Sequence, residues 1–286
     1  MAALIRSGRS VGGSAARRRI SSSAAASEAW DRSPASLGRE GAAEIGVPAR
    51  RGVRWVFLGC PGVGKGTYAS RLSQLLGVPH VAMGDLVRDE LASPAPLAKE
   101  LAGIVNQGKL VPDEIIVNLL SEHLKNGEAK GESGFILDGF PRTIRQAEIL
   151  EGVADIDLVI NLKLREEALL MKCLGRRICR ECGGNFNVSS VDIKGGDGRP
   201  HIYMPQILPP EQCLSKLVIR EDDADEKVVK TRLRIYFDVT QPVEEFYRSR
   251  GKLLEFDLPG GIPESWRKLL EALNLEDPAN RQSAAL

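Results

Sequence analysis

A glycine-rich loop between an apolar run and a helix-like segment constrains this chain more than any other feature. Residues 53–58 (VRWVFL) form a short apolar run with β-forming residues, which predicts a buried strand. They lead directly into residues 59–67 (GCPGVGKGT), and apolar residues then recur at helical spacing over residues 68–76. Strand, glycine loop and helix in this order predict a phosphate-binding loop, where backbone N–H groups and the helix N-terminus face an anion.

The loop supplies candidate contacts to a nucleoside phosphate. Lys65 is expected to reach the β- and γ-phosphates. Gly66 stands where the usual pattern has Ser or Thr, and Thr67 comes one residue later, so the hydroxyl available for Mg²⁺ is expected to be that of Thr67. The alternative is a glycine-rich turn that carries a surface lysine. The flanking strand and helix favour the phosphate loop.

Four further stretches resemble, in order and spacing, the signatures of the adenylate kinase family of nucleoside monophosphate kinases. They are residues 81–88 (VAMGDLVR), 108–113 (GKLVPD), 134–143 (GFILDGFPRT) with Gln146, and 175–177 (GRR). The DGFPRT segment is the most specific of them, and the resemblance extends over residues 53–256. It implies an α/β fold: a three-layer P-loop kinase core with a five-stranded parallel sheet and helices on both faces. The alternation of short apolar strands with helical stretches independently supports a parallel sheet.

The resemblance implies reversible, Mg²⁺-dependent phosphoryl transfer from ATP to AMP, giving two ADP and serving adenine nucleotide homeostasis. Such a reaction depends on positioning and on charge stabilisation by planar, permanently charged donors. By the resemblance, Arg88 and Arg142 hold the AMP phosphate, while lid arginines close over the phosphates from the other side. The expected catalytic residues are Lys65, Arg88, Arg142, Arg176, Arg220 and Arg232.

The resemblance also assigns the binding residues. Residues 134–137 read as a strand that delivers Asp138 at its carboxyl end, where parallel sheets bind ligands, so Asp138 and Thr67 are expected to organise Mg²⁺. The expected ATP contacts are Gly62, Val63, Gly64, Lys65, Gly66, Thr67, Arg176, Asn185, Phe186 and Gly260. The expected AMP contacts are Met83, Arg88, Lys109, Leu110, Val111, Gly139, Phe140, Pro141, Arg142, Gln146, Arg220 and Arg232.

Two positions depart from the common family pattern. Met83 stands where many members have a Thr that contacts the AMP base, and Lys172 stands where an Arg often stacks on the ATP adenine. Neither touches the phosphates, but both bear on base selectivity. They keep open a GTP:AMP phosphotransferase of the same fold. A non-catalytic nucleotide-sensing module is the second alternative, although a degenerate member would be expected to have lost some of the phosphate-handling arginines or Lys65.

Two inserts are expected to move on the core: an AMP-binding part at residues 82–111 and a lid at residues 176–223. The lid length resembles the long-lid branch of the family, some members of which bind zinc through two CxxC pairs. Here only three of the cysteines are placed for such a site: Cys179, Cys182 and Cys213. Pro210 stands where the remaining one would be. Asp197 or His201 could supply a fourth ligand, but a lid held by hydrogen bonds with free thiols is favoured, because structural zinc needs four ligands.

The N-terminal segment predicts an organelle transit peptide. Residues 1–27 carry five arginines and no acidic residue, and they are rich in Ser and Ala. A cytosolic tail is the alternative. The Ser/Ala-rich composition and the lid resemble plastid forms and favour the chloroplast stroma, with the mitochondrion as alternative. Residues 1–50 are therefore excluded from the kinase domain at 51–276, and residues 277–286 are expected to form a disordered tail.

Charge and hydropathy narrow the class of partner. The whole chain has a net charge of +1, so the part after residue 27 carries −4 once five arginines are set aside. A mildly acidic body does not favour nucleic acid. No apolar run reaches the length of about 20 residues that a membrane span needs. The expected partners are ATP, AMP and ADP, with no nucleic acid and no membrane, and the expected state is a monomer.

Overall fold

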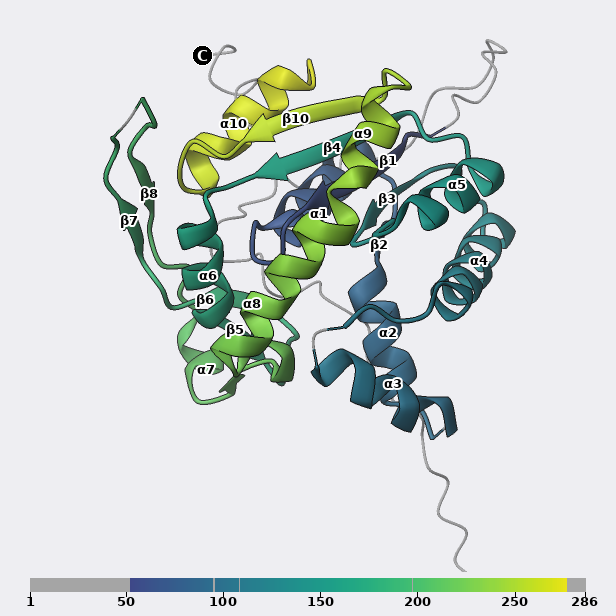
Figure 1. Cartoon of the computed structure of the whole chain (residues 1–286), viewed down its shortest axis with the longest axis horizontal. Helices are drawn as coiled ribbons and strands as arrows, with labels where there is room; N and C mark the ends of the chain where they lie inside the picture. The colour runs from purple at the N-terminus through teal and green to yellow at the C-terminus, as the bar shows by residue number, and fades with distance from the viewer. Residues whose placement is uncertain (1–51, 95, 108, 197, 277–286) are drawn as a thin grey trace, which may run out of the picture.

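A five-stranded parallel sheet forms the centre of the molecule, in the order β10-β4-β1-β3-β2. The computed structural model describes residues 52–94, 96–107, 109–196 and 198–276 (Figure 1). All four strand pairings of this sheet are parallel. The strands are β1 (Arg54–Gly59), β2 (His80–Ala82), β3 (Phe135–Asp138), β4 (Leu158–Lys163) and β10 (Leu253–Asp257). The predicted α/β fold with a five-stranded parallel sheet is confirmed.

Helices cover both faces of this sheet, because alternate side chains of each strand point to opposite faces. Phe57 and Ile160 belong to one buried apolar cluster, whereas Val56 and Val159 belong to the other. The first cluster is covered by α1 (Lys65–Leu76), α6 (Glu166–Leu174), α8 (Glu226–Ile235) and α10 (Ile262–Ala272). The second is covered by α2 (Met83–Leu91), α4 (Asp113–Ala129), α5 (Ile144–Val153) and α9 (Pro242–Arg248). The expected three layers are present, and α3 (Pro96–Asn106) packs beside α2.

Helix boundaries follow local capping chemistry. The side chain of Thr143 accepts a hydrogen bond from the backbone N–H of Gln146 and starts α5. Asp225 caps α8 in the same way, through the N–H of Lys227. Pro242 begins α9 after a π-helical turn, η2 (Tyr236–Thr240), as a proline in the first helical turn can. The first helix begins at Lys65, earlier than the predicted residue 68, because the glycine loop ends at Gly64.

The segment expected to form the lid has a small sheet of its own. It consists of the antiparallel strands β5 (Arg176–Cys179), β6 (Asn185–Asn187) and β9 (Leu217–Val218), followed by the turn η1 (Glu221–Asp223). A hairpin of β7 (Val191–Ile193) and β8 (Ile202–Met204) leaves this sheet, and a short helix, α7 (Glu211–Leu214), follows it.

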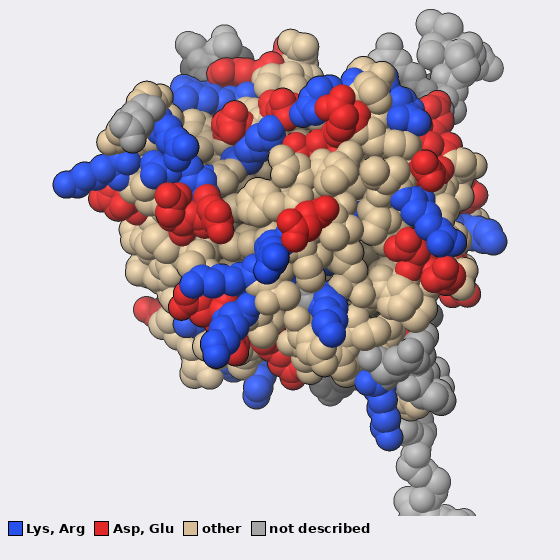
Figure 2. Space-filling view, viewed as in Figure 1, with Lys and Arg blue, Asp and Glu red and all other residues tan. Residues whose placement is uncertain are grey.

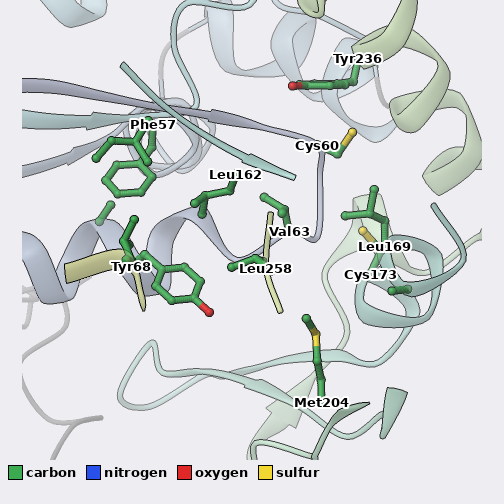
Figure 3. Close-up of a cluster of buried hydrophobic side chains, with 14 of the residues drawn as sticks. Phe57, Cys60, Val63, Tyr68, Leu162, Leu169, Cys173, Met204, Tyr236 and Leu258 are labelled. Atoms are coloured by element: carbon green, nitrogen blue, oxygen red, sulfur yellow. The ribbon is translucent and has the colours of Figure 1, made fainter. Parts of the chain in front are cut away.

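The β7–β8 hairpin packs against the main core rather than against the lid. Val191, Ile202 and Met204 are buried and belong to the same apolar cluster as α1, α6 and α10. Figure 1 shows the hairpin running along the side of the molecule toward α10, and Figure 3 shows Met204 below Leu169 and Cys173. The sequence did not predict this packing.

Two expectations concern the ends of the chain. The expected leader at residues 1–50 and the expected tail at 277–286 lie outside the described residues.

Among the described residues, every helix is too short or too polar to cross a membrane.

A candidate nucleotide site at the carboxyl ends of the strands

The glycine loop after β1 has a shape that larger residues would prevent. Gly62 and Gly64 have φ angles of 84° and 109°, in the left-handed region that favours glycine. A Cβ atom on Gly62 would lie 2.7 Å from the Sγ of Cys173 and 2.9 Å from a carbonyl of α6. No side chain caps the N-terminus of α1. The positive end of the helix therefore remains available to an anion, although the N–H of Val63 is bonded to the carbonyl of Cys60 at 3.2 Å.

Lys65 lies under this loop, where its ammonium group donates hydrogen bonds to the carbonyls of Gly59 (2.7 Å) and Cys60 (3.1 Å). Burial, opposed by the charge of Asp138 and assisted by that of Arg142, lowers the pKa of Lys65 to about 8. A bound polyphosphate would favour the charged form. The positive charge of Lys65 and Arg142 thus exceeds the negative charge of Asp138 at the position where a phosphate would lie.

Asp138 ends β3 next to the first turn of α1. A Cβ atom on Gly66 would lie 3.3 Å from its Oδ2 atom, so glycine at position 66 leaves this carboxylate its place. Burial would raise the pKa of Asp138, but His80 and Lys65 hold it below its ordinary value. The Nε2 atom of His80 lies 3.8 Å away, beyond hydrogen-bonding length. Asp138 is therefore an ionised carboxylate that lies beside Gly66, the residue before Thr67.

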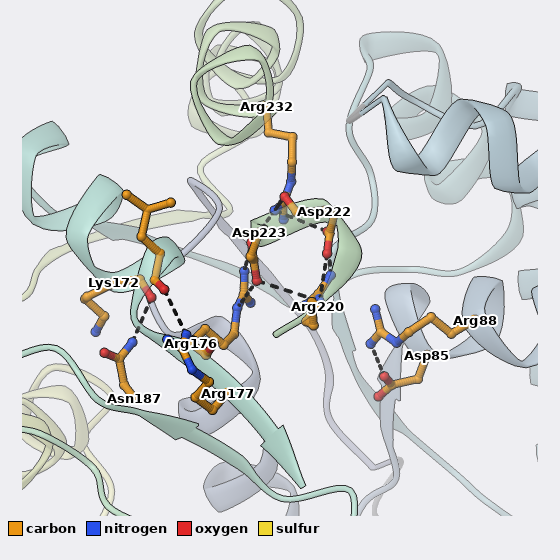
Figure 4. Close-up of polar contacts among 11 residues, drawn as sticks. Asp85, Arg88, Lys172, Arg176, Arg177, Asn187, Arg220, Asp222, Asp223 and Arg232 are labelled. Carbon is orange, nitrogen blue, oxygen red and sulfur yellow. Dashed lines mark hydrogen bonds and ion pairs between the residues drawn. The ribbon is translucent and has the colours of Figure 1, made fainter. Parts of the chain in front are cut away.

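Two adjacent aspartates hold in place Arg176 and Arg220 of the lid and Arg232 of α8 (Figure 4). Asp223 is fully buried and accepts two hydrogen bonds from Arg176, at 2.7 and 2.9 Å. It also accepts one from Arg232, at 2.5 Å. Asp222 accepts two from Arg220, at 2.9 and 2.6 Å. Such bidentate pairs fix the planes of the guanidinium groups.

The basic residues of the site outnumber its carboxylates. Arg142 donates to the carbonyl of Gly139 at 2.8 Å, and its pKa is lowered by burial and by the charge of Arg232. Burial, together with Arg176, lowers the pKa of Arg220 to about 10. All six predicted catalytic residues interact electrostatically in this region, and the carboxylates close to them are those of Asp85, Asp138, Asp222 and Asp223. Among the described residues, these six positive charges therefore face four carboxylates, and this excess of two favours a polyanionic ligand.

The residues predicted to contact AMP, apart from Arg220 and Arg232, lie on or next to α2, α4 and α5. Met83 begins α2 and is 2% exposed, and Val111 and Phe140 are buried. Lys109 and Leu110 lie in the loop after α3, and Gly139 precedes a cis Phe140–Pro141 peptide bond. The amide of Gln146 donates to Asp113 at 2.6 Å and accepts from the backbone N–H of Arg142 at 2.7 Å. It therefore positions Arg142 and keeps one N–H for a ligand.

The residues predicted to contact the ATP base meet the β7–β8 hairpin. The Nζ atom of Lys172 lies 3.8 Å from the Sδ atom of Met204, and burial lowers the pKa of Lys172 to about 8. A Cβ atom on Gly64 would lie 3.9 Å from that Nζ atom, and one on Gly260 would lie 3.4 Å from the carbonyl of Tyr203. The hairpin thus closes this end of the site, and Met204 is a lining residue that sequence reasoning missed.

Phe186 and Asn185 differ in what they can offer a nucleotide. The side chain of Phe186 is 5% exposed and packs with Cys179 and Cys213 inside the lid, so only its backbone is available. Asn185 is exposed at the start of β6. Two residues after Asn185, the side chain of Asn187 donates a hydrogen bond to the carbonyl of Lys172 at 2.7 Å, and this residue was also missed.

The two aspartates of the arginine cluster were the main omission of the sequence analysis. Asp222 and Asp223 follow Arg220 within three residues, and acidic residues so close to a predicted catalytic arginine are a usable signal. His80 was missed as well. Nothing in the sequence of β2 indicates that the side chain of His80 lies close to Asp138 of the neighbouring strand β3.

The structure brings the three lid cysteines together. Each pair of the Sγ atoms of Cys179, Cys182 and Cys213 lies within 4.8 Å. In the part of the chain that the structure describes, no fourth ligand joins this group. His201 lies on the hairpin with its Nε2 atom 2.6 Å from Asp192, and Asp197 lies outside the described residues. The thiols therefore supply three of the four ligands that a structural zinc takes.

Comparisons with known proteins agree with the motifs. A family model described as adenylate kinase matches residues 57–252. The rice (Oryza sativa subsp. japonica) protein "Probable adenylate kinase 6, chloroplastic" is 74% identical over 235 residues, which cover 82% of each chain. The Arabidopsis thaliana protein "Adenylate kinase 1, chloroplastic" is 66% identical over 268 residues, 94% of this chain and 93% of that one. A Solanum tuberosum protein named "Adenylate kinase" is 68% identical over 238 residues, 83% of this chain and 82% of that one.

The replacement Asp223→Asn tests the charge pairing of the cluster. It preserves shape but leaves Arg176 without its buried counter-charge and leaves Arg232 to its remaining ion pair with Asp222 at 3.2 Å, so we expect the free energy of unfolding in urea to fall by roughly 3 kcal/mol. The control Asp238→Asn removes an exposed carboxylate that pairs with Arg234 at 3.4 Å and should change it by less than about 0.5 kcal/mol. Added tripolyphosphate should recover part of the loss. Equal stability of Asp223→Asn and the wild type would contradict this pairing.

Proposed function

The chain belongs to the adenylate kinase family, whose reaction is the reversible transfer of the terminal phosphoryl group of ATP to AMP to give two ADP, and we propose that its cluster of arginines and Lys65 carries this reaction. The observation behind the proposal is the excess of positive charge around the glycine loop. A polyanion with phosphates on both sides of a transferred group would balance that charge. Two nucleotides bound head to head have this form.

The arrangement suits in-line transfer between the two phosphate chains. Lys65 and the loop amides would bind the β- and γ-phosphates of ATP, while Arg88 and Arg142 would hold the phosphate of AMP. Arg176, Arg220 and Arg232 would approach from the lid side, as the resemblance implied. Charge that develops on the transferred group would then be surrounded by donors oriented in advance. No general base is needed, because the attacking phosphate oxygen is already anionic.

The residues predicted to organise Mg²⁺ suit that ion. Mg²⁺ prefers oxygen ligands and usually keeps several waters. Asp138 is held ionised, and the carboxylate lies at the first turn of α1, one residue away from the hydroxyl-bearing Thr67. When bound with ATP, Mg²⁺ would neutralise negative charge on the phosphate oxygens. Asp138 would hold the ion through water, and Thr67 would offer its hydroxyl.

Each end of the site would bind one base, and the two inserts would close over the substrates. Met83, Gln146 and the backbone of residues 109–111 would contact the AMP base, while Lys172 and Gly260 would contact the ATP base. The AMP-binding part (82–111) and the lid (176–223) would close over the substrates and exclude water, which favours transfer over hydrolysis.

We place the protein in the chloroplast stroma and expect it to act as a monomer on soluble nucleotides. The acid-free, arginine-containing N-terminus supports an organellar leader, and two of the relatives are named chloroplastic. On the face shown in Figure 2, basic and acidic side chains are interspersed. This face does not offer the one-sided basic patch that nucleic acid requires.

A coupled assay of the purified protein tests the function. With Mg²⁺ and ATP, we expect rapid ADP formation that requires AMP, and much slower transfer to UMP, CMP or GMP. Replacement of ATP by GTP as donor should lower the rate. Faster transfer from GTP than from ATP would establish the GTP:AMP alternative. Tight ATP binding without transfer to any monophosphate would support the nucleotide-sensing alternative and overturn the proposal.

Arg142→Ala tests the role of the arginine of the DGFPRT segment. Since its guanidinium group is proposed to hold the AMP phosphate through the transition state, we expect turnover to fall by about 100-fold or more. Arg145→Ala is a matched control three residues away: its side chain is 67% exposed, it pairs with Glu114 at 3.4 Å, and its loss should change turnover by less than about twofold. A folded Arg142→Ala enzyme with normal turnover would remove this residue from the mechanism.

Proton uptake on ATP binding tests the charge deficit around Lys65. Its pKa of about 8 in the free protein leaves part of the population uncharged near pH 8, and a polyphosphate favours the ammonium form. Between pH 8 and 9 we therefore expect ATP binding to take up protons and to weaken as pH rises. Calorimetry in buffers of different ionisation enthalpy measures the uptake.

The second buried lysine provides the control for that experiment. Burial also lowers the pKa of Lys172 to about 8. The replacement Lys172→Arg keeps the positive charge at all pH values used and therefore removes the contribution of Lys172 to the proton uptake. The uptake that remains belongs to Lys65. Identical binding heats in all buffers would show that Lys65 is fully charged before ATP binds.

A further inference from the structure

The lid contains a group of thiols that the phosphoryl transfer does not use. The Sγ atoms of Cys182 and Cys213 lie 3.6 Å apart, and the third thiol, of Cys179, lies within 4.8 Å of both. All three belong to the small apolar cluster of the lid, together with Phe186 and Leu217. Each is a free thiol. They are separate from the arginine cluster and from the glycine loop.

The two closest thiols come from different elements. Cys182 lies in the turn between β5 and β6, where its Sγ atom accepts a hydrogen bond from the N–H of Gly184 at 3.4 Å. Cys213 lies on α7, which packs beside the lid sheet (Figure 1). A disulfide needs sulfur atoms that can approach to about 2 Å with little backbone movement, and side-chain rotation covers a remaining gap of this size.

Accessibility decides which thiol reacts first. Cys213 and Cys179 are 5% and 1% exposed, whereas Cys182 is partly exposed. A reagent in solution therefore reaches Cys182, and the buried Cys213 lies behind it as the resolving thiol. An exposed cysteine backed by a second thiol is the arrangement found in reversible thiol switches.

We propose that Cys182 and Cys213 form a reversible disulfide that fastens the β5–β6 turn of the lid to α7. The oxidant is a protein or small-molecule disulfide. Cys182 attacks one of its sulfur atoms, forming a mixed disulfide and releasing the first thiol. Cys213 then attacks the sulfur of Cys182, the second thiol leaves with the proton, and two electrons have passed from the lid to the oxidant. A dithiol reverses both steps.

The link would restrain a large part of the lid. It joins residues 31 positions apart and encloses β6 together with the β7–β8 hairpin. Closing a loop of this length reduces the freedom of the opened chain. Oxidation is therefore expected to oppose local unfolding of the lid, with little effect on the arginines, none of which contacts the three thiols through a hydrogen bond or ion pair described above.

The test uses the full chain equilibrated with mixtures of reduced and oxidised glutathione, quenched with acid, alkylated and mapped by mass spectrometry. We expect one intramolecular disulfide, between Cys182 and Cys213, that dithiothreitol removes. Cys182→Ser and Cys213→Ser should abolish it, and Cys179→Ser should preserve it. Cys60→Ser and Cys173→Ser replace buried thiols of the main core and are the matched controls that should also preserve it.

Limited proteolysis supplies an independent measurement. Oxidation should slow cleavage within the lid by about tenfold or more in the wild type, because a typical disulfide shifts an opening equilibrium at least that far. It should have no effect on Cys182→Ser.

Three outcomes would overturn the proposal. The first is that Cys182 and Cys213 remain alkylated as thiols in every glutathione mixture. The second is a disulfide between Cys179 and Cys182 in place of the predicted one. The third is a purified protein that retains about one equivalent of zinc and resists oxidation until a chelator removes it.

Discussion

The pairing of two buried aspartates with arginines of the lid and of α8 is the interaction on which the site depends. Three guanidinium groups close together repel one another, and without Asp222 and Asp223 the cluster would not hold its shape. The two carboxylates fix the guanidinium planes but do not neutralise the whole site, to which Lys65 and Arg142 add further charge. Buried ion pairs give little net stability for their desolvation cost. Their role here is to keep an excess of positive charge in one orientation until anions arrive.

The parallel sheet brings charged residues that are far apart in the sequence together at the carboxyl ends of its strands. The carboxyl ends of β1 and β3 lie side by side, because these strands pair with Arg54 opposite Phe135 and run in the same direction. The glycine loop follows one strand and Asp138 ends the other, so Lys65 and Asp138 meet although 73 positions separate them. Helices on both faces bury the apolar side chains of these strands. The geometry at the strand ends is therefore a consequence of packing at the strand centres.

Local signals predicted the loop and the sheet, because strand, glycine turn and helix are adjacent in the sequence and each follows its own hydrophobic period. The arginines were found only through their motifs. The partners of those arginines were not found, because the contacts of Asp223 with Arg176 and Arg232 join separate elements. The hairpin was missed for another reason: β7 and β8 have three residues each, too few to show a period, and the burial of Met204 is decided by the main core.

The burial of Met204 in the main core helps to explain how the lid is held against the rest of the molecule. The lid has an apolar cluster of only three buried residues, Cys179, Phe186 and Cys213, and so small a core cannot stabilise a sheet alone. The remaining support comes from outside it: Asp223 ties Arg176 at the start of β5 to α8 through Arg232, and the β7–β8 hairpin packs on the main core. The first tie lies at the arginines proposed to hold the phosphates, and the second lies at Lys172 and Gly260, which are proposed to contact the base of the donor nucleotide. Under the proposed function, movement of the lid would change contacts at both ends of that nucleotide and would couple closure to its binding.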